Sequence, residues 1–324
     1  MRRREFLAAS AAAAATGLAG TRASAQAASW PDKPVKLILP YAPGGATDAI
    51  GRPWAEALSK AFGQQFVVEN RGGAGGMIGT EAVAKAAPDG YTLLLTPNAT
   101  LTVLPTLRKT PYDPVKSFAP IARVGDLVCG FVVHPSVGVK TMPELIAYAK
   151  KNPGKLVYGS AGLGTATQLR IEMLKWKTGV DILHVPYRGS ADALNDLLPG
   201  TVQMMNEIVV LPHVKAGKLI LLNINHSTRN PDFPDVPTLT ELGIKDADVP
   251  IWYSILAPTG TPEDIIAKLN EKIVELAKTD DMKAKMRTIN VEVPSQKPSE
   301  IADFIGVDTK RNAELIKAAN IKLE

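Results

Sequence analysis

Two glycine-rich turns have the composition needed to hold an anion. The first, "YAPGGATD" at residues 41–48, follows the apolar run "VKLILP" and leads into a helical pattern at 46–62. The second, "YGSAGLGTAT" at residues 158–167, also follows a strand pattern and opens a helix. Glycines let the backbone approach a ligand, hydroxyls add donors, and the helix dipole favours negative charge. The pattern predicts two anion-binding loops, although glycine also serves purely steric turns.

The order of the elements indicates how these turns would meet. Short apolar runs alternate with helical segments in both halves of the chain, which favours parallel, doubly wound α/β sheets. In open sheets of this class, ligands bind beyond the carboxyl ends of the strands, where both turns lie. We therefore expect the turns to face each other across a cleft. A third glycine cluster, "NRGGAGGMIG" at 70–79, is either another wall or a tight packing turn.

Two long extended stretches, 119–135 and 248–258, separate the α/β repeats. Two such connections are what a hinged, two-lobed protein needs. We expect residues 26–126 and 249–324 to form the first lobe and residues 127–248 to form the second.

Signatures of catalysis and of cofactor binding are missing from the sequence. It contains no GxxxxGK[ST], GxGxxG, GxSxG or HExxH pattern, and its four histidines have no metal-ligand spacing. No catalytic residue, metal or cofactor is expected. The alternative is an enzyme with Asp48 or His184 as base, but no titratable pair is visible, and Asp48 more simply bonds its own loop.

Three further side chains have simple expected roles. Cys129 lies in an apolar run and is expected to be a small buried hydrophobe rather than a nucleophile. Arg170 and Lys175, on the helix after the second turn, are expected to face solvent, with Arg170 pointing to a ligand as the alternative.

The N-terminus reads as an export signal. Residues 1–25 combine a basic start, an alanine-rich apolar stretch and an Ala-Ser-Ala cleavage site, and Arg3 and Arg4 match the twin-arginine pattern. Removing this segment takes away four arginines and one glutamate, so the formal charge falls from +5 to +2. No basic stripe with interleaved aromatics follows, so nucleic acid is not an expected partner. We expect a soluble protein of the periplasm.

The chain after the signal resembles the Bug family, the extracytoplasmic solute receptors of tripartite tricarboxylate transporters. The resemblance rests on "YAPGGATDAIGR", "VENRGGAGGMIGTEAVAKAAPDGYTLL", "GSAGLGTATQL", "HVPYRGSADALNDLLPG", "LPHVKAGK", "PDVPTLTELG" and "APTGTPEDIIAKLN". It implies a two-lobed periplasmic binding protein of type II, which closes like a flytrap on a small carboxylate. It also implies an integral-membrane permease as partner, or a sensor kinase. We expect a monomer, because the protein must hinge freely.

The resemblance and the two turns together suggest the ligand-binding residues. On the first lobe they are Ala42, Pro43, Gly44, Gly45, Thr47 and Asp48, and on the second they are Ser160, Ala161, Gly162, Gly164, Thr165 and Thr167. Tyr187 and Arg188 match a family segment near the cleft, while Thr96 and Asn98, after the third strand, are expected to line the first lobe. All four could instead have packing or turn roles.

Two departures from the family pattern concern the far end of the ligand. Gln168 stands where the family usually has histidine, and Asn206-Glu207 stands where a Phe-Asp pair is frequent. Glu207 in the cleft would disfavour a second carboxylate and favour an amine, amide or hydroxyl. A transcriptional effector domain of related architecture is a further alternative, but it would require a DNA-binding module that the sequence lacks.

Overall fold

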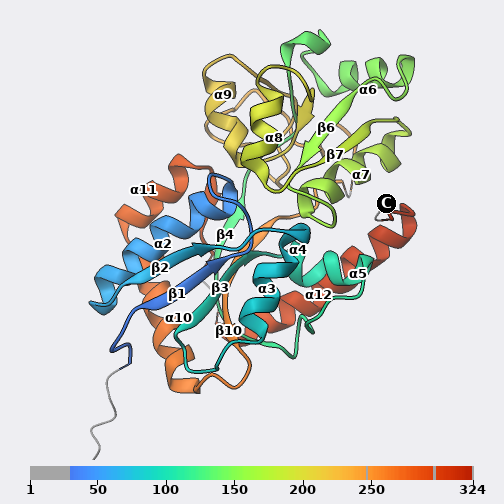
Figure 1. The fold of residues 1–324 in the computed structure, drawn as a ribbon. Coiled ribbons are helices and arrows are strands. Elements are labelled where there is room, and N and C mark those ends of the chain that lie inside the picture. Colours follow the sequence, from blue (N-terminus) through green and yellow to red (C-terminus); the bar gives the residue numbers. More distant parts are fainter. Residues whose placement is uncertain (1–29, 246, 295–296, 323–324) are drawn as a thin grey trace, which may run out of the picture. The chain divides into compact units, whose positions relative to one another are not determined.

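The structure is a computed structural model that describes residues 30–245, 247–294 and 297–322 (Figure 1). The expected export signal, residues 1–25, lies outside the described residues. Within the described part, two β-sheets are present, each with its own helices. We call the first sheet with its helices the first lobe, and the second sheet with its helices the second lobe.

The first sheet has six strands in the order β11-β4-β10-β3-β1-β2. Its strands are β1 (Val35–Leu39), β2 (Phe66–Asn70), β3 (Thr92–Pro97), β4 (Phe118–Leu127), β10 (Trp252–Pro258) and β11 (Val291–Glu292). Its helices are α2 (Ala46–Phe62), α3 (Met77–Ala84), α4 (Ala99–Thr102), α5 (Leu104–Leu107), α10 (Glu263–Ala277), α11 (Asp280–Thr288) and α12 (Pro298–Ala318), with the 3-10 turn η1 (Ala74–Gly76).

The second sheet has five strands in the order β7-β6-β8-β5-β9. Its strands are β5 (Val132–Val133), β6 (Val157–Ser160), β7 (Leu183–Pro186), β8 (Met204–Met205) and β9 (Ile220–Leu221). Its helices are α6 (Met142–Lys151), α7 (Ala166–Thr178), α8 (Ser190–Leu197) and α9 (Leu211–Lys215), with the 3-10 turns η2 (Pro135–Val137) and η3 (Ile208–Val210).

Both sheets are mixed rather than wholly parallel. Parallel pairing holds where helices connect the strands, in β2-β1-β3 and in β7-β6-β8. Strand β10 runs antiparallel to both β3 and β4, since the chain leaves the first lobe after β4 and returns through β10. The two extended stretches expected from the sequence thus contain the strands that connect the lobes. The exact lobe boundaries at 126/127 and 248/249 stay a prediction.

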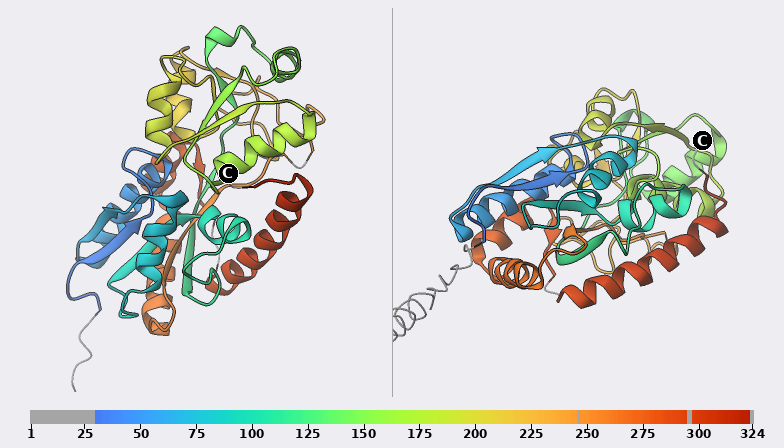
Figure 2. Two further views of the ribbon diagram at one scale, coloured as in Figure 1. Left: turned by 45° about the vertical axis from the view of Figure 1, so that its right-hand side comes forward. Right: turned by 60° about the horizontal axis from the view of Figure 1, so that its bottom comes forward.

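Helices cover both faces of the first sheet. Helices α2, α10 and α11 contact one another, while α12 contacts α4 and α5 and lies beside them in every view (Figure 2). The core between sheet and helices includes Ile38, Leu94, Trp252, Leu256 and Ile305, each at most 2% exposed. No helix in the described ranges has the length and apolar character needed to cross a membrane.

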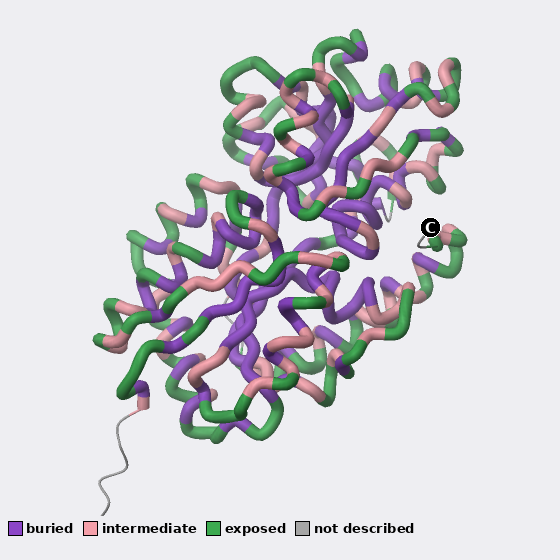
Figure 3. Tube along the Cα trace, in the orientation of Figure 1, coloured by how far each residue is buried: buried purple, intermediate pink, exposed green. Residues whose placement is uncertain are grey.

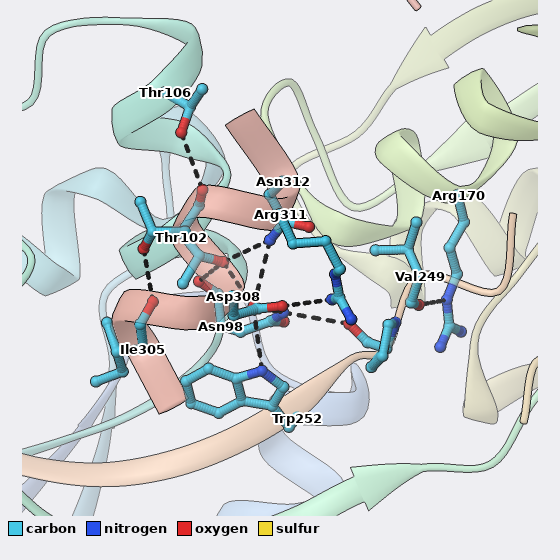
Figure 4. A network of polar contacts seen from close by, with 12 residues as sticks. Asn98, Thr102, Thr106, Arg170, Val249, Trp252, Ile305, Asp308, Arg311 and Asn312 are labelled. Carbon is cyan, nitrogen blue, oxygen red and sulfur yellow. Dashed lines mark hydrogen bonds and ion pairs between the residues drawn. The ribbon is translucent and has the colours of Figure 1, made fainter. Parts of the chain in front are cut away.

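A buried carboxylate fixes the last helix to the first sheet (Figure 4). Asp308 of α12 is 2% exposed. Its Oδ2 accepts hydrogen bonds from Asn98 Nδ2 at 2.9 Å, Thr102 Oγ1 at 3.0 Å and Trp252 Nε1 at 3.2 Å. Arg311, one turn later, forms an ion pair with Oδ1. One side chain thereby joins α12, α4, β10 and the end of β3.

Arg170 of α7 contacts both segments that connect the lobes. Its Nε donates to the carbonyl of Val249 at 2.6 Å, and Nη1 lies 3.0 Å from Cys129 Sγ. Asn98 of the first lobe donates to the next carbonyl, that of Pro250, at 3.2 Å. Arg170 is completely buried, so its expected exposure is wrong. The connecting segment is therefore bonded by both lobes, and Figure 3 shows buried backbone running between the two sheets.

Candidate functional site

Carboxyl ends of strands from both lobes meet at one pocket, which we call the cleft pocket. Its lining residues are Tyr41, Gly45, Ala46, Thr47, Pro97, Ala161, Thr165, Ala166, Thr167, Ser190, Glu207, Ile251 and Tyr253. The cavity volume is about 20 Å³, which is room for about one water molecule. Since small-molecule sites usually have about 300–1,000 Å³, a ligand can enter only when these walls separate.

Helix α2 presents an uncapped N-terminus to the cleft pocket. Its N-cap is Gly45, which provides no side-chain hydrogen bond to the first turn. The first-turn residues Ala46 and Thr47 line the pocket. Because the first N–H groups of a helix have no intrahelical partner, this end offers backbone donors and the positive end of the helix dipole.

Helix α8 meets α2 with the same kind of end. Its N-cap is Gly189, again without a side-chain cap, and Ser190 begins the helix. A Cβ placed on Gly45 would lie 3.6 Å from the backbone nitrogen of Ser190, and one on Gly189 would lie 3.3 Å from the Cβ of Ala42. The N-termini of the two helices therefore lie next to each other.

The second glycine loop satisfies its own backbone donors. Gly164 N donates to Gln168 Oε1 at 2.7 Å, Ala161 N to Thr167 Oγ1 at 3.1 Å, and Gly162 N to the hydroxyl of Ser160 at 3.1 Å. These three N–H groups therefore have side-chain partners within the loop. Gln168, 5% exposed, shapes the loop.

The first glycine loop is fixed by Asp48. Its Oδ2 accepts from Gly44 N at 3.2 Å and from Arg52 Nε at 2.8 Å, and Oδ1 accepts from Asn70 Nδ2 at 3.1 Å. Burial raises the pKa of Asp48, but the bonds from Arg52, Gly44 and Asn70 outweigh it and lower the pKa overall. This geometry is that of a carboxylate bonding its own loop.

Of the residues expected to bind ligand, about a third line the cleft pocket. They are Gly45, Thr47, Ala161, Thr165, Thr167 and Glu207. A second group belongs to the same loops but not to the lining: Ala42, Pro43, Gly44, Asp48, Ser160, Gly162 and Gly164.

The four remaining positions have other partners. Thr96 Oγ1 lies 2.8 Å from Thr100 Oγ1, and the Asn98 amide bonds Asp308 and Pro250 as described. Tyr187 donates its hydroxyl to Asp196 Oδ2 at 2.6 Å, while Arg188 is exposed. These contacts match the packing and turn roles that the sequence left open.

Several lining residues were missed by sequence reasoning, above all Tyr41, Ser190 and Tyr253. Ser190 follows a glycine between a strand and a helix, which is the signal used for the other two loops. Tyr41 is the first residue of the first loop and could have been included. Tyr253 lies within strand β10, and nothing local marks it as a pocket residue.

Glycines also allow the two lobes to touch beside the pocket. A Cβ on Gly75, which has φ +68°, would lie 2.3 Å from the carbonyl oxygen of Leu163, and one on Gly164 would lie 2.5 Å from Leu104 Cδ1. Tyr41 donates its hydroxyl to the carbonyl of Gly75 at 2.9 Å. The third glycine cluster therefore meets the second loop but contributes no lining residue to the cleft pocket. A Cβ on Gly76 or Gly79 would lie 2.7 Å from neighbouring atoms, as expected of a tight packing turn.

The structure brings together one pair that the sequence did not show. Ser160 Oγ lies 2.7 Å from His184 Nε2, and His184 stacks on Tyr158 with ring centroids 4.5 Å apart. Ser160 is completely buried, and its hydroxyl also bonds the backbone of Gly162. Burial lowers the pKa of His184 to about 4. A hydroxyl enclosed in this way holds the loop in shape.

Glu207 is the acidic group of the cleft pocket. It follows β8 and is 2% exposed. Its Oε2 accepts from Ser190 Oγ at 2.9 Å and its Oε1 from the backbone nitrogen of Ile208 at 3.1 Å. Burial raises the pKa of Glu207, and these two bonds together with the charge of Arg170 only partly offset that rise.

Replacing this carboxyl should stabilise the protein at neutral pH. Because the folded-state pKa of Glu207 is raised, its ionised form opposes folding. This cost is absent below the ordinary value of 4.5, grows as pH rises above it, and is complete once pH has passed the folded-state pKa. We expect Glu207→Gln to raise the free energy of unfolding by about 1–3 kcal/mol at pH 7. Urea denaturation at pH 4 and pH 7 measures this, and an equal difference at both pH values would contradict it.

No group of three or more His, Cys, Asp or Glu side chains in the described part of the chain is placed to hold a metal ion. The single cysteine, Cys129, is buried and free, as expected.

Comparison with known proteins shows the family of this chain. Residues 50–321 match the family described as tripartite tricarboxylate transporter family receptor. The chain belongs to this receptor family. It is 35% identical to protein BugT of Bordetella pertussis (strain Tohama I) over 313 residues, which cover 94% of this chain and 95% of BugT. The expected Bug relationship is thus confirmed.

Solved structures of similar receptors confirm the two-lobed fold. Periplasmic binding protein BugD has a TM-score of 0.87 at 35% identity, over 91% of this chain and all of that one. Rpa4515 of R. palustris, solved with adipate, has a TM-score of 0.87 at 32% identity. The match covers 90% of this chain and 99% of Rpa4515. MatC of Rhodopseudomonas palustris, with bound malate, has a TM-score of 0.85 at 30% identity. The match covers 89% of this chain and 100% of MatC. The chain is a solute-binding protein of this receptor family.

Proposed function

We propose that this receptor holds a small organic carboxylate between the first and second glycine loops. The observation that carries the proposal is the cleft pocket that both loops line, through Gly45 and Thr47 of the first and Ala161, Thr165 and Thr167 of the second, together with the uncapped N-termini of α2 and α8. Their first-turn N–H groups supply donors and positive dipole ends that suit an anion. The similar proteins Rpa4515, solved with adipate, and MatC, with bound malate, support a carboxylate ligand here.

The binding mechanism is closure of the lobes. The pocket of about 20 Å³ has walls from both lobes, so entry requires opening, and a ligand that touches both walls stabilises the closed state. The size of the shift is set by the difference in ligand affinity between the two states. Arg170 and Asn98, which bond neighbouring carbonyls of one connecting segment, are suited to guide this motion.

The partner and compartment follow from the family rather than from the site. We propose that the receptor delivers its ligand to integral-membrane permease subunits of a tripartite tricarboxylate transporter, or, as a variant, presents it to a sensor kinase. We also propose that the receptor is exported to the periplasm by a twin-arginine signal and acts there as a monomer. We also propose that the protein binds without catalysis, because the Ser160 hydroxyl next to His184 has no exposed surface.

A thermal-shift panel tests the function. Small mono-, di- and tricarboxylates, amino acids and aromatic acids are offered to the purified protein, each paired with the amide of its carboxyl group. Binding should stabilise the protein by about 2.7 kcal/mol at a hundredfold excess over Kd. We expect at least one acid to raise the Tm and its amide to leave the Tm unchanged. A flat response to every acid would contradict the proposal, and release of a product on incubation would favour the enzyme.

A further inference from the structure

We infer that this receptor selects a carboxylic acid that also carries an ammonium group, and that Glu207 makes the choice. The inference rests on the proposed function and narrows its ligand class. Glu207 lines the cleft pocket together with the first-turn residues of α2 and α7. A ligand carboxylate held at these first turns would therefore have its other functional groups beside Glu207.

The carboxylate of Glu207 has acceptor capacity left over. An ionised carboxylate offers about four hydrogen-bond positions, and two are occupied here, by Ser190 Oγ and the nitrogen of Ile208. Among the described residues, no basic side chain forms an ion pair with Glu207. Arg170 is near enough to influence its charge, but its Nε and Nη1 are directed to Val249 and Cys129.

The Tyr41 hydroxyl, which also lines the pocket, does not replace the missing donor. It donates to the carbonyl of Gly75 at 2.9 Å, so it is directed at a protein partner. The unfilled positions on Glu207 are left for the ligand.

The charge of the pocket decides which donor fits. A second carboxylate would place two negative groups side by side in a buried site, which costs binding energy unless one is protonated. A hydroxyl would satisfy Glu207, but a charge-assisted hydrogen bond is about twice as strong as a neutral one. An ammonium group brings three donors and the opposite charge. The helix N-termini and Glu207 together thus complement a zwitterion.

Calorimetric titration with matched probes tests the inference. On carbon skeletons of three to six atoms, we compare the monocarboxylate, the dicarboxylate, the 2-amino acid and the terminal amino acid, for example butyrate, succinate, 2-aminobutyrate and 4-aminobutyrate. At least one amino acid should bind about tenfold or more tighter than its mono- and dicarboxylate, equivalent to about 1.4 kcal/mol. Glu207→Gln should remove most of that advantage and improve the dicarboxylate.

The matched control is Glu314→Gln, the same change at an exposed position of α12, which should leave the ranking unaltered. Ser190→Ala keeps Glu207 and removes one of its donors, so the amino acid preference should persist or increase. It provides a second readout if Glu207→Gln folds poorly, which near-ultraviolet circular dichroism would reveal.

These measurements distinguish a failure of the role of Glu207 from a failure of carboxylate binding. If a dicarboxylate binds tighter than the amino acids, or if Glu207→Gln leaves their ratio unchanged, the role of Glu207 is refuted while carboxylate binding stands. Loss of the preference in Ser190→Ala would assign the choice to Ser190 instead. If no probe with a carboxylate binds, both the inference and the proposed function fail.

Discussion

Gly75→Ala is expected to push the two lobes apart. A Cβ at this position would lie 2.3 Å from the carbonyl oxygen of Leu163, and this contact is with backbone, which cannot rotate away. Cysteines introduced at the exposed positions Val67 and Leu183, one in each lobe, allow spin labels to report the distance between lobes. The variant should shift the distance distribution to longer values. A ligand held by both loops should bind the Gly75→Ala variant about tenfold more weakly than the unaltered protein. This corresponds to a loss of about 1.4 kcal/mol of binding free energy.

The control for this experiment is Gly63→Ala. Gly63 has φ +66°, close to the +68° of Gly75, but a Cβ there meets no atom within 4 Å. Both variants carry the same backbone strain, so a difference between them reports the contact with Leu163. Distance distributions that stay equal in the two variants would refute the argument that Gly75 permits lobe contact.

Asp308→Ala should lower the free energy of unfolding by about 3–5 kcal/mol, the range for breaking a buried charged network. The substitution leaves Trp252 Nε1, Asn98 Nδ2 and Thr102 Oγ1 without their carboxylate acceptor in the interior. Each buried donor left without an acceptor costs about 1–3 kcal/mol, and Thr102 retains an alternative in the carbonyl of Asn98. Urea denaturation measures the change.

Asp303→Ala, at an exposed position of the same helix, is the control and should change stability by no more than about 0.5 kcal/mol. Asp308→Asn keeps the shape of the side chain and should give an intermediate loss. Equal stabilities of Asp308→Ala and Asp303→Ala would show that the network does not hold α12.

The sequence predicts the local parts of this molecule well. Apolar runs followed by glycine and a helical pattern indicate β1 and α2, and the same signal indicates β6 and α7. These features depend on residues within about ten positions of one another, so a single sequence contains them. The position of both loops at one pocket also follows, because the carboxyl ends of the strands share an edge in each sheet.

Side-chain partners that are distant in sequence could not be predicted in this way. Asn98 follows a strand end like a ligand-binding residue, yet its amide bonds Asp308, 210 positions away. Arg170 has the charge of a surface residue, yet it is buried because it meets Val249 and Cys129. His184 joins Ser160 only because β6 and β7 pair side by side. Each depends on how the strands are ordered in the sheet.

The buried thiol of Cys129 can report how often the connecting segment opens in the unaltered protein. Cys129 is completely buried in a connecting segment, and burial raises the pKa of its thiol. A thiol-specific reagent can react only during openings of that segment, so the alkylation rate reports their free energy, about tenfold for each 1.4 kcal/mol. A ligand that favours the closed lobes therefore slows alkylation of the unaltered protein, and it needs no introduced label to be detected.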